Sequence, residues 1–293
     1  MQIKKTDLIV NADGSIYHLQ LRPNEIASNI VFVGDPNRVP MVSSHFDSIE
    51  IKRESREFVT HTGHYHGHRL SVVSTGIGTD NIDIVVNEID ALHNIDFVTK
   101  TAKENLTSLN FIRIGTSGTI QNDIPIDSFV VSAKAIGFDA LGSYYDTPQN
   151  KNCISKSNAF VYLLSKLIEA EMKPYLVDAS DALLQQIDTG FIEGITATMP
   201  GFYAPQGRAL RAQSKLTKDL VPFLAEQNYS GQRISNIEME TAGIYLLASA
   251  LGHHAISFNA ILANRHTDEF SAKAEQTIQD LILKVLEIYF PLE

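Results

Sequence analysis

Residues 111–118 read Phe-Ile-Arg-Ile-Gly-Thr-Ser-Gly, an apolar run that contains an arginine and ends in a glycine-rich turn. Apolar side chains on both faces of such a run are typical of a strand covered on both sides of a sheet. An arginine inside such a strand is costly unless a negative charge pairs with it. Arg113, together with Thr116 near the end of the strand, therefore indicates either a site for phosphate or a carboxylate, or a structural ion pair.

Other apolar runs flank this one and alternate with helical patterns. In the helical stretches, apolar residues recur at spacings of three and four, the period of one helix face. No repeat or proline- and serine-rich linker interrupts the chain, so we expect a single domain over residues 1–293, of the α/β class with a mostly parallel or mixed sheet. The expected strands are residues 30–33, 70–74, 129–132 and 255–262, and the expected helices are residues 82–92, with Asp80 as the cap, 241–251 and 278–289.

Glycine-rich turns follow three of the expected strands. Ligands of such folds bind at the carboxyl ends of the strands, so these turns are the first places to look for a site. Residues 34–38 (Gly-Asp-Pro-Asn-Arg) offer a backbone N–H and an arginine to an anion, but they are also ordinary turn residues. Residues 76–81 match a dinucleotide-binding fingerprint only in part, because Asn81 stands in place of the third glycine. We interpret them as a tight strand-to-helix turn.

Two later segments carry polar side chains suited to a sugar and a heterocycle. Glu238 and Glu240 lie two residues apart, and paired carboxylates can accept hydrogen bonds from vicinal hydroxyls or do acid–base work. The alternative is a pair of solvated glutamates at a helix start. Residues 202–208 combine Phe202 with the amide of Gln206 and the guanidinium of Arg208, which suits a planar heterocycle. An exposed loop is the alternative there.

The composition excludes several classes of function. With 24 basic and 34 acidic residues the formal net charge is −10, which argues against non-specific binding to nucleic acid or to an anionic membrane. No apolar run reaches the ~20 residues of a membrane span, and no apolar segment follows the N-terminal lysines as in a secretory signal. Cys153 is the single cysteine, so no intrachain disulfide forms, and we expect a cytoplasmic protein.

Four histidines stand close together, as metal ligands would: His61, His64, His66 and His68. Glycines interrupt the run, and no cysteine or carboxylate lies at ligand spacing. We therefore interpret the segment as a hairpin connection and expect no metal site.

Taken in order, these motifs resemble the nucleoside phosphorylase family, over nearly the whole chain from Tyr17 to Arg265. The framework segments are residues 34–36, 74–78, 113–116 and 238–240, and Gln206-x-Arg208 is typical of the uridine-specific branch. The resemblance implies a three-layer α/β/α sandwich around a central mixed sheet. It also implies a pentosyltransferase that reversibly converts uridine and phosphate to uracil and ribose 1-phosphate, with no cofactor. Phosphorolysis of a purine or modified nucleoside, nucleoside hydrolysis and nucleoside sensing are the alternatives.

The resemblance further implies roles for single residues, with Arg113, Glu240, Gln206 and Arg208 in catalysis. Phosphate would bind to Gly34, Arg38, Arg113, Thr116 and the neighbouring subunit's copy of Arg56. Ribose would bind to Glu238, Met239, Glu240 and the neighbour's copy of His18. The base would bind to Phe202, Gln206, Arg208, Leu262 and Ala263.

The implied assembly is a homodimer or a trimer of dimers with shared active sites. The purine branch usually places an aspartate where this chain has Asn264, which favours a pyrimidine. In some relatives a glutamate matching Glu57 helps to hold a monovalent cation between subunits. Asn81 replaces a serine there, so the resemblance leaves open whether this chain binds that cation.

Overall fold

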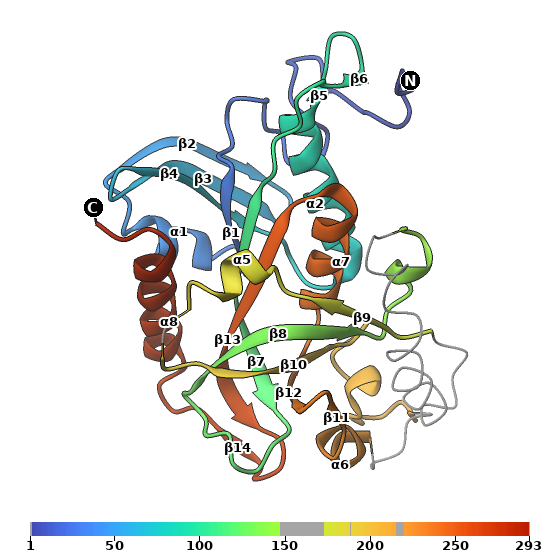
Figure 1. The fold of residues 1–293 in the computed structure, drawn as a ribbon, viewed down its shortest axis with the longest axis vertical. Helices are drawn as coiled ribbons and strands as arrows, with labels where there is room; N and C mark the ends of the chain where they lie inside the picture. The colour runs from blue at the N-terminus through green and yellow to red at the C-terminus, as the bar shows by residue number, and fades with distance from the viewer. Residues whose placement is uncertain (1, 147–172, 188, 215–219, 293) are drawn as a thin grey trace.

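A mixed β-sheet runs through the molecule (Figure 1). The computed structural model describes residues 2–146, 173–187, 189–214 and 220–292, and Cys153 lies outside these residues. The main path of the sheet is β11 (Asn228–Tyr229), β12 (Gln232–Glu238), β10 (Ile192–Thr198), β8 (Phe129–Gly137), β13 (His254–Asn264), β7 (Asn110–Thr119), β1 (Asn29–Val33), β4 (His68–Ser74), β3 (Phe58–Tyr65) and β2 (Ser48–Ser55). β9 (Tyr175–Asp178) and β14 (Glu269–Phe270) pair with β8 and β13, and β5 (Ile95–Asp96) pairs with β6 (Thr101–Ala102).

Helices cover both faces of the central strands, which gives the three layers that the resemblance implies. In Figure 1, α2 (Thr79–Asn94) and α7 (Thr241–Leu251) lie on one side, and α1 (Arg38–Ser43) and α8 (Ala274–Tyr289) lie on the other. The shorter helices are α5 (Asp181–Leu184), α6 (Leu220–Ala225), η1 (Leu141–Ser143) and η2 (Ala204–Gln206).

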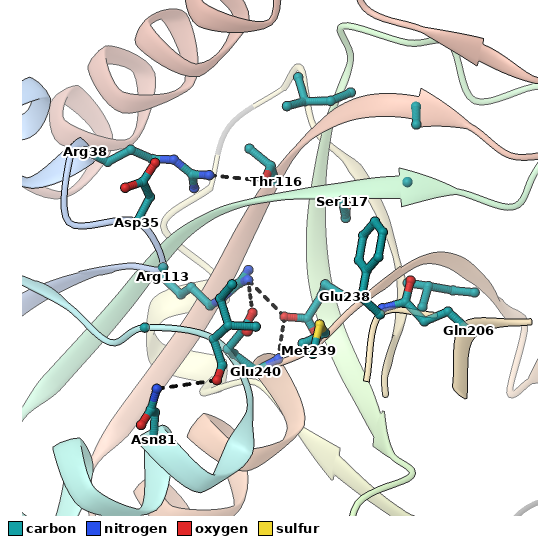
Figure 2. A pocket seen from close by; sticks show the side chains of 18 of the residues that line it. Asp35, Arg38, Asn81, Arg113, Thr116, Ser117, Gln206, Glu238, Met239 and Glu240 are labelled. Atoms are coloured by element: carbon teal, nitrogen blue, oxygen red, sulfur yellow. Dashed lines mark hydrogen bonds and ion pairs between the residues drawn. The ribbon is translucent and has the colours of Figure 1, made fainter. Parts of the chain in front are cut away.

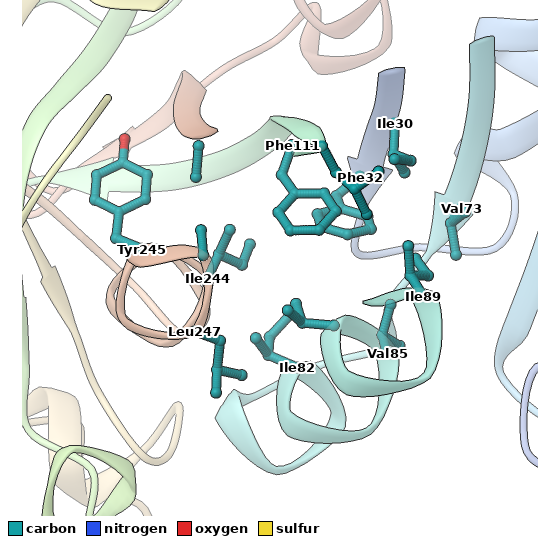
Figure 3. Close-up of a cluster of buried hydrophobic side chains, with 14 of the residues drawn as sticks. Ile30, Phe32, Val73, Ile82, Val85, Ile89, Phe111, Ile244, Tyr245 and Leu247 are labelled. Carbon is teal, nitrogen blue, oxygen red and sulfur yellow. The ribbon is translucent and has the colours of Figure 1, made fainter. Parts of the chain in front are cut away.

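The alternation of side chains along β1 explains why both faces are covered. Ile30 and Phe32 pack into the cluster beneath α2 and α7, whereas Val31 and Val33 pack into the cluster beneath α1 and α8. Figure 3 shows the first cluster, in which Phe32 stacks on Phe111 of β7 with ring centroids 5.0 Å apart. Each such fully buried side chain contributes about 1.5–3 kcal/mol to the hydrophobic stabilisation.

The central strands run parallel and therefore end at one edge of the sheet. β1 pairs in parallel with both β4 and β7, and β7 pairs in parallel with β13. The residues that follow these strands, or lie near their carboxyl ends, consequently meet although they are far apart in sequence. Gly34, Gly76 and Thr116 are brought together in this way.

The expected strands and helices are all present, with differences at their ends. α7 has the expected bounds, and residues 76–78 form the expected turn between β4 and α2. Asp80 is not the cap of α2, however: the cap is Gly78, at φ 92°, and Asp80 lies inside the first turn. β7 continues to Thr119 because its second half pairs with β13. Within the described residues, no helix is long and apolar enough to cross a membrane.

The histidine segment is a hairpin, but its turn is shorter than expected. His61 and His64 lie within β3, and only residues 66–67 connect β3 to β4. His61 contacts the Ser43 hydroxyl, and His64 pairs with Glu50 at 3.3 Å. Among the described residues, no group of three or more potential metal ligands comes together.

Candidate active site

A cavity of about 730 Å³ opens at the carboxyl ends of the parallel strands. All the residues that the sequence assigns to phosphate, ribose or base line this cavity, except Arg56 and His18. These residues lie in segments spread between Gly34 and Ala263, and the fold brings them together around one cavity. Figure 2 shows several of these side chains around Arg113.

Arg113 lies at the centre of the site, and only 4% of it is exposed. Its Nη2 lies 2.7 Å from Glu240 Oε2 and 3.0 Å from Glu238 Oε2 (Figure 2). Its Nη1 donates to Asn259 Oδ1 at 3.0 Å, with Ser257 Oγ at 3.4 Å. The arginine inside the strand is therefore paired, and its two carboxylate partners line the same cavity.

Glu238 and Glu240 occupy different environments although both contact Arg113. Glu238 is the last residue of β12, and its carboxylate accepts hydrogen bonds from the backbone N–H groups of Glu240 and Thr241 and from the Thr241 hydroxyl. It thus satisfies backbone donors at the start of α7, where Glu240 is the N-cap residue. Glu240 accepts from the Gly78 N–H at 2.8 Å as well as from Arg113. Both glutamates are buried, so they are not a solvated pair at a helix start.

The charges of this cluster are tightly linked. Burial raises the pKa of Glu240, and the attraction of Arg113 only partly opposes that effect. Burial works against the charge of Arg113 too, but the nearby Glu238 and Glu240 raise its pKa overall. The cluster of one guanidinium and two carboxylates has one more negative than positive charge when all three groups are ionised.

Arg38 supplies a second cation on the other side of the cavity. It begins α1, directly after the turn that follows β1, and its Nη2 lies 3.3 Å from the Thr116 hydroxyl (Figure 2). Burial, together with the charge of Arg113, lowers the pKa of Arg38. Gly34 directly follows β1, at the start of the same turn, and it lines the cavity. Two guanidinium groups, a hydroxyl and a glycine turn are a suitable set for an oxyanion.

The loop after β10 supplies the other end of the cavity. Gln206 is buried in this segment, whereas Phe202 and Tyr203 are exposed, so the loop is anchored at Gln206 and only partly solvated. Arg208 donates to the Gln206 side-chain oxygen and to the Phe202 carbonyl, the latter at 2.8 Å. The Arg208 guanidinium also lies over the Phe202 ring, 3.9 Å from its centroid. One face of Phe202 is therefore covered by Arg208.

Strand β13 contributes two consecutive residues to the same end of the cavity. Side chains of neighbouring strand residues normally point to opposite faces. The pairing of β13 with β7 is interrupted between Ile261 and Ala263, and this bulge allows both Leu262 and Ala263 to line the cavity.

Arg56 and His18 lie away from the cavity of their own chain. The Arg56 guanidinium is 5.8 Å from the ring centroid of Tyr17, and Arg56 has a φ of 56°. His18 Nδ1 lies 2.6 Å from Glu88 of α2, and the backbone N–H of His18 also donates to that carboxylate. His18 is thus held by Glu88, whereas Arg56 lies exposed on the surface of the chain.

Sequence reasoning missed several residues at the site. Phe270, 75% exposed, lines the cavity because the β13–β14 hairpin returns to it, and no local pattern predicts that return. Arg265 donates to the Gln206 carbonyl at 2.5 Å. Burial and the nearby Arg208 lower the pKa of Arg265 to about 10. The apolar residues around Ser257 and Asn259 predict the strand but not the contact of these two side chains with Arg113.

Comparisons with known proteins agree with this geometry. Residues 29–287 match the phosphorylase superfamily. A uridine phosphorylase of Thermococcus kodakarensis is 30% identical over 90% of this chain and 83% of its own length. A purine nucleoside phosphorylase (DeoD-type) of a Thermoanaerobacter species is 27% identical over 92% of this chain and 98% of its own.

The structural likeness extends over almost the whole fold. The crystal structure of a Trypanosoma brucei nucleoside phosphorylase, described as having uridine phosphorylase activity, covers 96% of this chain with a TM-score of 0.84 at 29% identity. This chain in turn covers 99% of that structure. With the fold, the cavity and the sequence in agreement, the chain belongs to the phosphorylase superfamily.

Proposed function

We propose that this chain is a uridine phosphorylase, a pentosyltransferase that converts uridine and phosphate reversibly to uracil and ribose 1-phosphate. The observation that carries the proposal is a single cavity with paired Arg113 and Glu240 at one end and Gln206 with Arg208 at the other. The relatives named as uridine phosphorylases support the same reaction.

Phosphate binds between Arg38 and Arg113, with Thr116 and the Gly34 turn completing the site in this subunit. Ribose lies next to Met239 and Glu240, whose carboxylate accepts from the sugar hydroxyls. Holding both groups aligns a phosphate oxygen with the anomeric carbon, so that much of the entropic cost of the reaction is met on binding. Glu238 supports this end of the cavity by satisfying backbone donors at the start of α7 and pairing with Arg113.

The glycosidic bond breaks as the phosphate oxygen attacks, and the bonding electrons move onto the departing uracil. Gln206 and Arg208 donate to the uracil edge and stabilise the negative charge that gathers there. Uracil N1 takes up a proton after the bond has broken. No enzyme-bound intermediate, metal or other cofactor is needed for these steps.

The environment of Asn264 supports a pyrimidine rather than a purine as the base. Asn264, at the position where the purine branch usually has an acid, uses its amide for structure. Its Nδ2 donates to the carbonyls of Gln121 and Ile124, and its Oδ1 accepts from the backbone of His266 and Thr267. Asn264 therefore ties the loop after β13 to the segment after β7, and its amide cannot supply a proton to a base.

We further propose that the active unit is a homo-oligomer, a dimer or a trimer of dimers, located in the cytoplasm. Arg56 and His18 lie at the subunit surface, outside the cavity, which suits residues given to a neighbour's phosphate and ribose sites. The low cysteine content, one in 293 residues, suits a reducing compartment.

An absorbance assay of the purified protein tests the proposed reaction. Uridine is incubated with and without phosphate, and inosine is treated in parallel. We expect uracil to be released only when phosphate is present, and uridine to be turned over much faster than inosine.

Two other outcomes would overturn parts of the proposal. Turnover of inosine but not uridine would keep the phosphate site and contradict the roles of Gln206 and Arg208. Release of uracil without phosphate would make water the nucleophile and would leave Arg38 and Arg113 without their proposed ligand.

A further inference from the structure

Asn259 on β13 is fully buried and contacts the central arginine of the site. Its Oδ1 accepts from Arg113 Nη1 at 3.0 Å, while its Nδ2 has no hydrogen-bond partner among the residues that the structure describes. A guanidinium has only donors, so the amide oxygen must face Arg113 and the amide nitrogen must face away. An unpaired buried N–H group costs free energy, and a group kept at such a cost calls for an explanation.

The pairing of β7 with β13 places Asn259 where it can act on the arginine. Ser257 lies opposite Arg113 and Asn259 lies opposite Gly115, so the four residues share one face of the sheet. The Arg113 side chain folds back over Gly115, where a Cβ would come within 2.0 Å of Nη1. Gly115 therefore makes room for the guanidinium, and Asn259 meets it from the adjacent strand.

The two ends of the guanidinium are held by different kinds of partner. Nη2 contacts the carboxylates of Glu240 and Glu238, and Nη1 contacts the neutral amide of Asn259. In the proposed reaction Glu240 also accepts from the ribose hydroxyls, whereas Asn259 contacts Nη1 from outside the cavity. A neutral partner does this without adding a further negative charge beside the phosphate.

We propose that Asn259 is a positioning residue that holds the Arg113 guanidinium in place for phosphate. The inference rests on the proposed function, because it takes phosphate as the ligand of Arg113. Asn259 is not among the residues that line the cavity, so it acts through Arg113 rather than on a substrate. Its removal should affect phosphate much more than nucleoside.

The test compares Asn259→Ala with the wild type and with a matched control. The matched control is Asn110→Ala. In the wild type the Asn110 amide lies in the same sheet and donates to Asn29 Oδ1 at 2.8 Å, away from the cavity. Affinity for inorganic phosphate is measured without nucleoside, from the phosphate-dependent rise in melting temperature, and KM values for phosphate and uridine are measured in the assay.

We expect Asn259→Ala to weaken phosphate binding and to raise the phosphate KM about tenfold, while the uridine KM changes by less than about twofold. Asn110→Ala should lose stability without changing either KM. An equal rise of both KM values, or an unchanged phosphate KM, would overturn the role of Asn259. A wild-type protein that does not respond to phosphate would instead contradict the proposed function.

Asn259→Asp covers the case in which the alanine variant does not fold, because it keeps the shape of the side chain and the oxygen that faces Arg113. Its carboxylate holds Arg113 more tightly and repels phosphate, so we expect weaker phosphate binding again, with the uridine KM unchanged. Wild-type phosphate affinity in this variant would contradict the inference.

Discussion

At Glu240, the negative charge that the proposed reaction uses also repels the neighbouring carboxylate of Glu238. Its carboxylate is buried beside a second carboxylate, and one arginine serves both. Glu240→Gln removes the excess negative charge, but its single amide oxygen can serve either Arg113 or the Gly78 N–H and not both, since these donors use different oxygens of Glu240. We expect the stability of this variant to stay close to that of the wild type at neutral pH, because the removed repulsion offsets the lost hydrogen bond, and its kcat/KM for uridine to fall about 100-fold. Urea unfolding and steady-state kinetics on the same preparation measure both effects.

Glu238→Gln is the matched comparison. Unlike Glu240→Gln, this variant is expected to lose stability. The glutamine cannot match a carboxylate that accepts from two backbone N–H groups and the Thr241 hydroxyl at the start of α7. We expect a loss of about 1–2 kcal/mol in the free energy of unfolding. If Glu240→Gln proved to be the less stable of the two variants, the different roles assigned to these glutamates would be wrong.

The raised pKa of Glu240 also predicts a pH dependence of stability. In the unfolded chain this carboxyl ionises at the ordinary value of 4.5, whereas burial in the folded protein raises its pKa. Between these two values the folded protein holds a proton that the unfolded chain lacks, so stability falls as pH rises. The slope attributable to this group approaches about 1.4 kcal/mol per pH unit.

Unfolding of Glu240→Gln over a pH series isolates this contribution. The stability of this variant relative to the wild type should increase as pH rises above 4.5 and become constant above the raised pKa. A constant difference between the two proteins from pH 4.5 upward would show that Glu240 titrates normally.

At the scale of the elements, the turn between β4 and α2 links backbone conformation to the site. Gly78 has a φ of 92° with open space where a Cβ would lie, and its N–H donates to Glu240. Gly78→Ala therefore tests the backbone conformation without a steric clash. We expect it to cost about 1–2 kcal/mol of stability and to lower kcat/KM, because the strained turn shifts its bond to Glu240.

Gly67→Ala is the control for that turn. Gly67 has a φ of 78° and equally open surroundings, but it lies in the β3–β4 hairpin turn, away from the cavity. Gly67→Ala should lose about as much stability as Gly78→Ala but keep the kcat/KM of the wild type. Equal activity in the two variants would mean that the Gly78 turn has no influence on the site.

The elements also show how far sequence reasoning reaches. Local patterns were sufficient for the buried strands, for α7 and for the glycine turns, because burial on both faces and helical spacing leave direct marks in the sequence. They were insufficient where pairing with a distant strand decides the outcome. The extension of β7 to Thr119, the return of Phe270 to the cavity and the contact of Asn259 with Arg113 all depend on β13.

At the scale of the whole molecule, the surface that carries Arg56 and His18 has to be explained together with the cavity. Glu88 of α2 fixes the His18 backbone and ring, and Tyr17 lies between His18 and the Arg56 guanidinium, in contact with both. Side chains that lie at the surface and do not line their own cavity suit delivery to a second copy of the chain. In a symmetric pair, each subunit would then both give and receive these residues.

Mixed oligomers test this exchange directly. We expect Arg113→Lys, which lacks the forked donors for phosphate, and Arg56→Ala each to be nearly inactive alone. In a mixed dimer, one site combines both defects, whereas the other combines an intact Arg113 with an intact Arg56 from its partner. Random mixing of equal amounts by refolding or co-expression should therefore restore about a quarter of the wild-type activity. Near-normal activity of Arg56→Ala alone, or no recovery in verified mixed oligomers, would place every functional residue of the site in one chain.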